Sequence, residues 1–168
     1  MTAAFNASKR LQESIKNVTS PAVKSLLMSS YSGVAQLPPL EKLESAAHSE
    51  VLIADPRWDQ GRVRAAVDAV FAAHPGLGTV FEPFLGSWTF RPGGWWVWAV
   101  EPPGVTVSEA RNRQRALFDM RIGRLFAVSL IPGTPDRLVV TASRLCMDSA
   151  SWSTVLNDLM VNYRSRLS

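Results

Sequence analysis

The end of the chain constrains the fold most strongly, because three elements with clear periodicity follow one another there. Two apolar runs, residues 124–131 and 136–143, flank a short turn that contains two prolines and a glycine, which predicts two antiparallel strands. Apolar side chains then recur at helical spacing to the end of the chain. They are Trp152, Val155, Leu156, Leu159, Met160, Tyr163 and Leu167. The sequence therefore predicts a strand pair that leads into an amphipathic helix.

A second strand-and-helix unit is predicted upstream. Residues 51–54 form a short apolar strand, and Asp59 or a neighbour begins a helix that runs to about residue 73 and ends at the His74-Pro75-Gly76 sequence. Apolar residues of this helix repeat at the spacing of a single buried face. They are Val63, Val67, Val70 and Phe71.

Extended segments are predicted for residues 77–84, 87–92 and 94–100, and the glycines between the last two predict a hairpin turn. Thr106 and Glu109 then have the spacing of a capping box, which predicts a helix to about residue 117. Its arginines indicate a solvated face.

The first 45 residues form a different kind of segment. Polar sequence with a short apolar stripe predicts helices over 7–18 and 20–30, and 40–47 has the pattern of a further short helix. We interpret residues 1–45 as a helical extension for docking or dimerisation, and residues 46–168 as the main domain.

Composition excludes several classes of protein. The net charge of +4 is spread along the chain, whereas nucleic-acid binding requires clustered basic residues interleaved with aromatic ones; a mildly basic face remains compatible with an acidic carrier protein. The single cysteine excludes an internal disulfide and a Cys-based zinc cluster, so no metal or cofactor site is expected. The chain contains no apolar stretch of membrane-spanning length, so we expect a cytoplasmic protein that does not bind membranes.

Four tryptophans lie within eleven residues, three of them at positions 95, 96 and 98. Strand alternation places Trp95 on the opposite face from Trp96 and Trp98, so at least one indole should be exposed. Two interpretations stay open: these side chains pack in the core, or Trp95, Trp96 and Trp98 form a patch that binds a partner.

A helix followed by three segments has the order that resembles the N-terminal half of nonribosomal peptide synthetase condensation domains. Residues 72–81 are similar to the family segment RHExLRTxF, residues 116–130 to FDxxxGPL, and residues 143–163 to HHxxxDG with its helix. The matching residues are His74, Leu77, Thr79, Phe81, Phe118, Asp119, Gly123, Leu125, Asp158, Leu159 and Tyr163. The resemblance implies an α+β (α/β sandwich) fold: a single chloramphenicol-acetyltransferase-like lobe with a mixed, mostly antiparallel sheet flanked by helices.

The chain departs from the family at the residues credited with the chemistry. Ser143 and Arg144 replace the two histidines of HHxxxDG, Asp148 is kept, and Ser149 replaces the glycine. A guanidinium stays protonated and cannot act as a general base, although it can anchor an anion or a carbonyl oxygen. Asp148 and Ser151 also match the DxxxxDxxS motif of heterocyclisation domains, with Ser143 where its first aspartate would stand. The choice between the two ancestries stays open.

Two further hypotheses concern this segment. The family's motif aspartate is held by an arginine from elsewhere, but the helix-strand corner that supplies arginines has Ala73 and Gly78 here. We therefore expect Arg144 to pair with Asp148, because an unpaired buried carboxylate is costly. Cys146 is either a nucleophile or a small packing residue; packing is favoured, since no histidine is near it in sequence.

Three functions follow as alternatives. The first is a catalytically degenerate interaction module of nonribosomal peptide or hybrid polyketide biosynthesis, which binds a carrier protein, an adjacent synthetase subunit or a second copy of itself. The second is an acyl- or peptidyl-transfer enzyme, for condensation or heterocyclisation, completed by a second lobe from another chain. Its substrates would be thioesters on the phosphopantetheine of a carrier protein. The third is an excised fragment of a larger synthetase.

Overall fold

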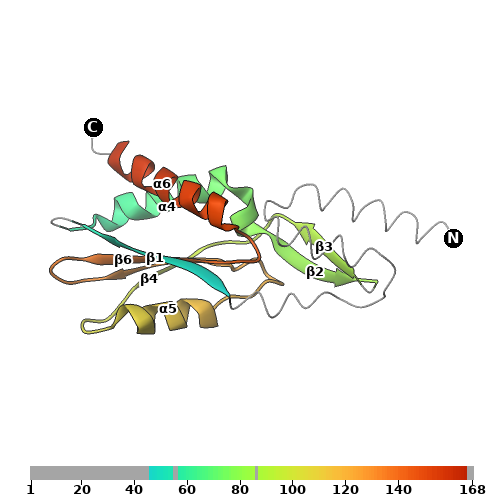
Figure 1. Ribbon diagram of the computed structural model, residues 1–168, viewed down its shortest axis with the longest axis horizontal. Helices are drawn as coiled ribbons and strands as arrows, with labels where there is room; N and C mark the ends of the chain where they lie inside the picture. The colour runs from blue at the N-terminus through green and yellow to red at the C-terminus, as the bar shows by residue number, and fades with distance from the viewer. Residues whose placement is uncertain (1–45, 55–56, 86, 166–168) are drawn as a thin grey trace.

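The computed structural model describes residues 46–54, 57–85 and 87–165, and in these ranges a four-stranded sheet carries helices on both faces (Figure 1). The strand order is β1-β6-β5-β4, and β2 and β3 form a separate pair. The elements are β1 (Ala47–Ile53), α4 (Gln60–Ala73), the 3-10 turn η1 (Pro75–Gly78), β2 (Val80–Phe84), β3 (Ser87–Arg91), β4 (Val97–Val100), α5 (Val107–Ala116), β5 (Phe126–Ile131), β6 (Arg137–Ser143) and α6 (Ser149–Ser165).

The sheet is built around the strand pair that the sequence predicts. β5 and β6 are antiparallel, with register from Phe126 opposite Ala142 to Ile131 opposite Arg137. β1 pairs antiparallel with the other edge of β6, and β4 pairs parallel with β5. The prediction of a mixed, mostly antiparallel sheet is confirmed.

The predicted hairpin between residues 87–92 and 94–100 is wrong. β3 pairs with β2, whereas β4 leaves for the main sheet. Gly94 explains the change of direction: its N–H donates to the Gly78 carbonyl at 2.9 Å, and a Cβ on Gly94 would lie 2.1 Å from the Gly123 carbonyl oxygen. Gly123 has a φ of +72°, which glycine adopts without steric cost. These glycines therefore allow three backbone segments, at Gly78, Gly94 and Gly123, to approach one another closely. They do not form a hairpin turn.

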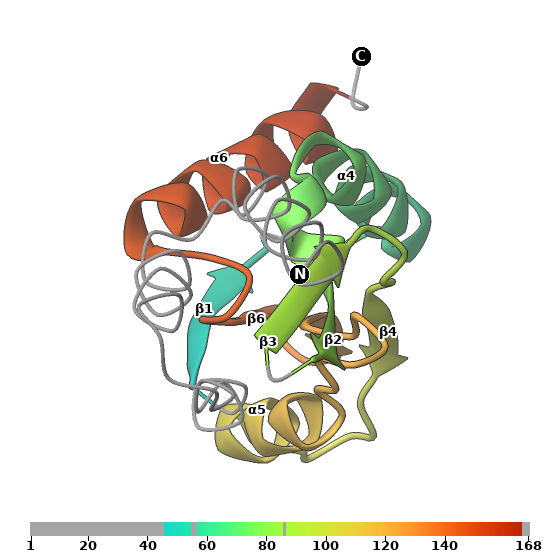
Figure 2. The same ribbon diagram turned by 90° about the vertical axis from the view of Figure 1, so that its right-hand side faces the viewer.

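The two faces of the sheet have different partners. α4 and α6 cover one face and α5 covers the other (Figures 1 and 2). Because side chains alternate along a strand, Leu138, Val140 and Ala142 of β6 join the large core under α4 and α6. Val139, between them, packs with Ala110 of α5 in a smaller cluster. The result is the three-layered α+β sandwich that was expected.

The helices begin where their capping residues predict. The Asp59 carboxylate accepts from the Arg62 N–H at 2.8 Å and caps α4. At α5 the capping box of Thr106 and Glu109 is complete; this backbone hydrogen bonding lowers the pKa of the Glu109 carboxyl. Each cap satisfies N–H groups that the first helical turn leaves unpaired.

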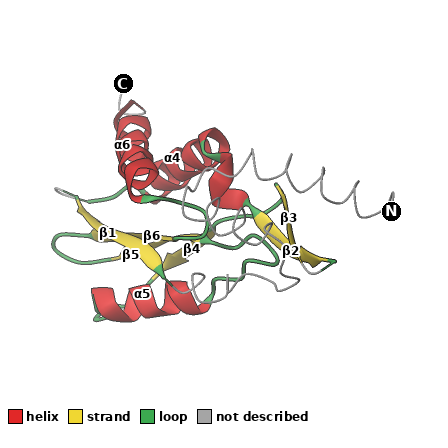
Figure 3. Ribbon diagram, turned by 45° about the vertical axis from the view of Figure 1, so that its right-hand side comes forward, coloured by secondary structure: helices red, strands yellow, loops and turns green. Residues whose placement is uncertain are grey.

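The β2–β3 hairpin lies beyond one end of the main sheet (Figure 3). Phe81 and Phe90 pack edge to face on it, with ring centroids 5.1 Å apart. The Phe81 N–H donates to the Met120 carbonyl at 2.9 Å, which ties the hairpin to the segment before β5.

The strand β1 begins earlier than expected. It starts at Ala47, so the helix predicted over 40–47 is wrong at Ala47. This residue instead pairs with Ser143, at one end of the seven-residue pairing of β1 with β6. Residues 40–45, the helices predicted over 7–18 and 20–30, and the proposed 1–45 extension lie outside the described residues. Among those described, no helix is long and apolar enough to cross a bilayer.

Candidate functional site

The residues that align with HHxxxDG form the connection from β6 to α6. Ser143 is the last residue of β6 and is fully buried. Its N–H donates to the Leu125 carbonyl at 2.8 Å, and its hydroxyl oxygen accepts from the Leu145 N–H at 3.2 Å. Its carbonyl accepts from the Cys146 N–H at 3.2 Å. The position of the first motif histidine is therefore part of the core and of a tight turn.

Arg144 stands at the second histidine position and is exposed. Its backbone N–H donates to the Ala46 carbonyl at 2.8 Å, which joins the turn to the start of β1. The predicted Arg144–Asp148 ion pair is absent. Ion pairs of the described residues join other groups: His74 to Asp158, Arg91 to Glu82, and Arg113 to Glu101.

Asp148 instead caps α6, which explains why it needs no arginine. Its Oδ1 accepts from the Ser151 N–H at 2.7 Å, and its carbonyl accepts from the Trp152 N–H at 2.9 Å. Asp148 is only half-buried, so the desolvation argument for a cationic partner does not apply. Its two hydrogen bonds satisfy N–H groups of the first turn of α6. Ser149, which replaces the motif glycine, is exposed in the first turn.

Cys146 lies inside this turn and is buried. Its thiol donates to the Ser143 carbonyl, with sulfur and oxygen 3.1 Å apart. Burial raises the pKa of the Cys146 thiol to about 12, and a protonated thiol is a poor nucleophile. The packing interpretation agrees with this environment. Among the described residues no group of three or more His, Cys, Asp or Glu side chains is placed to hold a metal ion.

His48 is the residue near the motif that the sequence did not reveal. It lies on β1 opposite Ala142 of β6, and its Nε2 donates to the Met147 carbonyl at 3.0 Å. Its ring stacks on Trp152 of α6, with centroids 5.8 Å apart. An imidazole therefore contacts the motif turn from a strand about a hundred residues away, a juxtaposition that comes only from the β1–β6 pairing.

The three tryptophans considered for partner binding divide into two groups. Trp96 and Trp98 pack edge to face at 6.3 Å, and the Trp96 indole N–H donates to Asp68 of α4 at 2.8 Å. They lie on the same side, as predicted, and attach β4 to α4. Trp95 is 48% exposed, so it is the most accessible of these three indoles.

Two segments of the family resemblance contact each other. His74, the C-cap of α4, has its Nε2 2.7 Å from a carboxylate oxygen of Asp158 on α6. Their side chains are 20% and 37% exposed, so this contact lies at the border of the two helices. The contact joins the end of α4 to α6.

Comparison with known proteins gives a match in structure alone. The sequence matches no protein-family model and no curated protein. The epimerization domain from the third module of tyrocidine synthetase B is similar with a TM-score of 0.64 and 22% identity, covering 74% of this chain and 30% of that chain. The starter condensation domain of rhizomide synthetase gives 0.60 and 12%, covering 84% and 35%. The condensation domain of the Monacolin K polyketide synthase gives 0.59 and 15%, covering 74% and 31%.

These matches define the class of fold. The described residues share the fold of the matched parts of these epimerization and condensation domains, which confirms the expected resemblance at the level of structure. The chain spans about a third of the length of the solved domains it matches. The fold therefore corresponds to part of those solved domains.

Proposed function

We propose that this chain is a catalytically degenerate, condensation-domain-like lobe that acts as an interaction module in nonribosomal peptide or hybrid polyketide biosynthesis. One observation carries the proposal: the turn that aligns with HHxxxDG joins β6 to α6 and contains no imidazole of its own. Ser143 is buried and hydrogen-bonded within the turn. The exposed Arg144 guanidinium stays protonated and cannot accept a proton.

The proposed partner is an acyl or peptidyl carrier protein or an adjacent synthetase subunit, with substrates held on the carrier's phosphopantetheine. Trp95 supports a protein interface beside β4, because its indole is half exposed, whereas the neighbouring Trp96 indole donates to Asp68 of α4. A tryptophan supplies a large, rigid contact area at a low cost in conformational entropy. A second copy of the chain is the remaining partner in this proposal.

Light scattering of the full chain, alone and mixed with carrier proteins and subunits of the same biosynthetic system, tests the proposal. We expect a dimer or a defined complex, weakened at least tenfold by Trp95→Ser. Val161→Ser on α6 is the matched control, since Val161 is also apolar and 55% exposed. A monomer that binds none of these proteins would overturn the proposal.

The trans-completed acyl- or peptidyl-transfer enzyme is favoured by one observation, the contact of His48 with the motif turn. In this alternative His48 supplies the imidazole that positions 143 and 144 lack. Product formation from carrier-bound thioesters in the paired state, lost in His48→Gln and kept in Arg144→Ala, would favour the enzyme. A stable complex without turnover would favour the interaction module.

A further inference from the structure

A pocket of about 260 Å³ lies at the far end of the central strands from the motif turn. It is formed by the loop between β5 and β6, residues 132–136, and by the segment that enters α4, residues 57–60. β6 separates this loop from Ser143 by seven residues, about 20 Å at the usual rise of a strand. The pocket is therefore distinct from the motif turn and does not depend on the proposed function.

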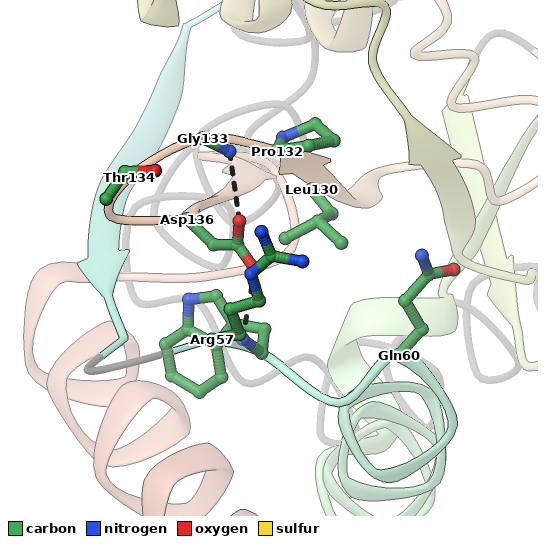
Figure 4. Close-up of a pocket in the computed structure, with 8 residues that line it drawn as sticks. Arg57, Gln60, Leu130, Pro132, Gly133, Thr134 and Asp136 are labelled. Carbon is green, nitrogen blue, oxygen red and sulfur yellow. Dashed lines mark hydrogen bonds between the residues drawn. The ribbon is translucent and has the colours of Figure 1, made fainter.

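A cation without a partner lines this pocket. Arg57 is exposed, and its guanidinium makes no hydrogen bond or ion pair with another described residue. Figure 4 shows it beside Leu130 and Asp136, with Gln60 across the pocket. A guanidinium presents a planar fork of N–H donors that matches the two oxygens of a carboxylate.

A buried anion faces the same space. Asp136 is only 6% exposed; Oδ1 accepts from the Gly133 N–H at 2.9 Å and Oδ2 from the Trp58 N–H at 3.2 Å. Each carboxylate oxygen can accept about two hydrogen bonds, so acceptor capacity remains. Among the described residues Asp136 has no ion-pair partner.

We propose that this pocket binds a small zwitterion of amino-acid size, with its carboxylate on Arg57 and its ammonium group near Asp136. A simple anion would be repelled by Asp136 and a simple cation by Arg57, whereas a ligand that carries both charges satisfies both groups. The volume of about 260 Å³ suits a ligand of amino-acid size. The pocket thus selects a short ligand, with Gln60 and Thr134 available for further polar contacts.

Backbone amide NMR shifts of Trp58, Gly133 and Thr134 in the full chain test this inference. The probes are L-alanine, with acetate and methylammonium as its two separate charged halves. We expect saturable shifts with L-alanine, at a midpoint on the order of millimolar, and at least tenfold weaker binding of either half. Arg57→Gln should weaken L-alanine binding at least tenfold. Arg115→Gln, on the exposed face of α5, is the matched control and should leave it unchanged.

Three outcomes would overturn the inference. The first is the absence of a saturable shift with L-alanine. The second is equal binding of acetate or methylammonium, which would assign the site to one charge alone. The third is a fall in melting temperature of Arg57→Gln with no probe binding to the parent chain, which would assign Arg57 to a structural ion pair with Asp136. None of these results bears on partner binding at Trp95, so failure here and failure of the proposed function are distinguishable.

Discussion

The two ends of the β5–β6 strand pair use their polar groups in opposite ways. At the motif turn the hydroxyl of Ser143 and the carboxylate of Asp148 hold the turn and the start of α6. At the other end Asp136 also ties a loop, but it does so facing a pocket beside an unpaired arginine. Polar groups at one end of the strand pair are thus taken up by the turn and the helix start, whereas those at the other end line a pocket.

The largest effect that would sharpen this comparison concerns Cys146 in the motif turn. With its pKa raised from 9.0 to about 12, the native thiol should react with iodoacetamide roughly a thousandfold more slowly at pH 8 than in the unfolded chain. Because the folded state favours the neutral thiol, this contribution to stability is present below about pH 9 and is lost as the pH rises toward 12. Equal labelling rates with and without denaturant would contradict a buried turn.

Restoring the first motif histidine should be strongly destabilising. Ser143→His places an imidazole at a fully buried position, so we expect a loss of about 3 kcal/mol in the free energy of unfolding from overpacking. Arg144→His, at the exposed neighbouring position, is the matched control and should change it by less than about 0.5 kcal/mol. Chemical denaturation of both variants measures the difference, and equal stability would mean that position 143 is open.

At the pocket end, Asp136→Ala should cost roughly 2 kcal/mol. The change removes the acceptor of the Gly133 and Trp58 N–H groups, and hydrogen bonds to a charged group are typically worth about 1.5–3 kcal/mol. Thermal unfolding measures the effect. A change below about 0.5 kcal/mol would show that the loop does not depend on this carboxylate.

In the motif turn, Asp148→Ala should cost about 1 kcal/mol, because α6 loses its N-cap. Asp148→Asn or Asp148→Ser should recover most of this loss, since either side chain can accept from the Ser151 N–H. Recovery distinguishes a cap from an ion pair, which neither substitute would replace. Denaturant unfolding of the three variants at one pH decides between them.

Arg144→Ala should have the smallest effect, within about 0.5 kcal/mol in the free energy of unfolding. Its guanidinium has no ion pair among the described residues, and its backbone hydrogen bond to Ala46 survives the substitution. Urea denaturation measures this, and a loss above 1 kcal/mol would mean that the guanidinium binds within the protein after all.

Much of the fold was predictable from local pattern. The strands β5 and β6, the helix α6 and the capped starts of α4 and α5 follow from apolar periodicity and from Asp59, Thr106 and Glu109. The hairpin predicted at residues 92–94 does not form, because the close approach of Gly123, and not a turn, requires a glycine at position 94. Glycine and proline in a segment indicate which backbone conformations it can adopt, but they do not indicate which strands pair.

Residue types and their spacing were enough to predict most strands and helices, and they show that positions 143 and 144 contain no imidazole. The remaining features depend on the tertiary structure. They are the capping of α6 by Asp148, the contact of His48 with the motif turn, and the position of Arg57 and Asp136 in one pocket. The physical reason is that contacts between residues far apart in the chain depend on strand pairing and layer packing, which no local pattern encodes.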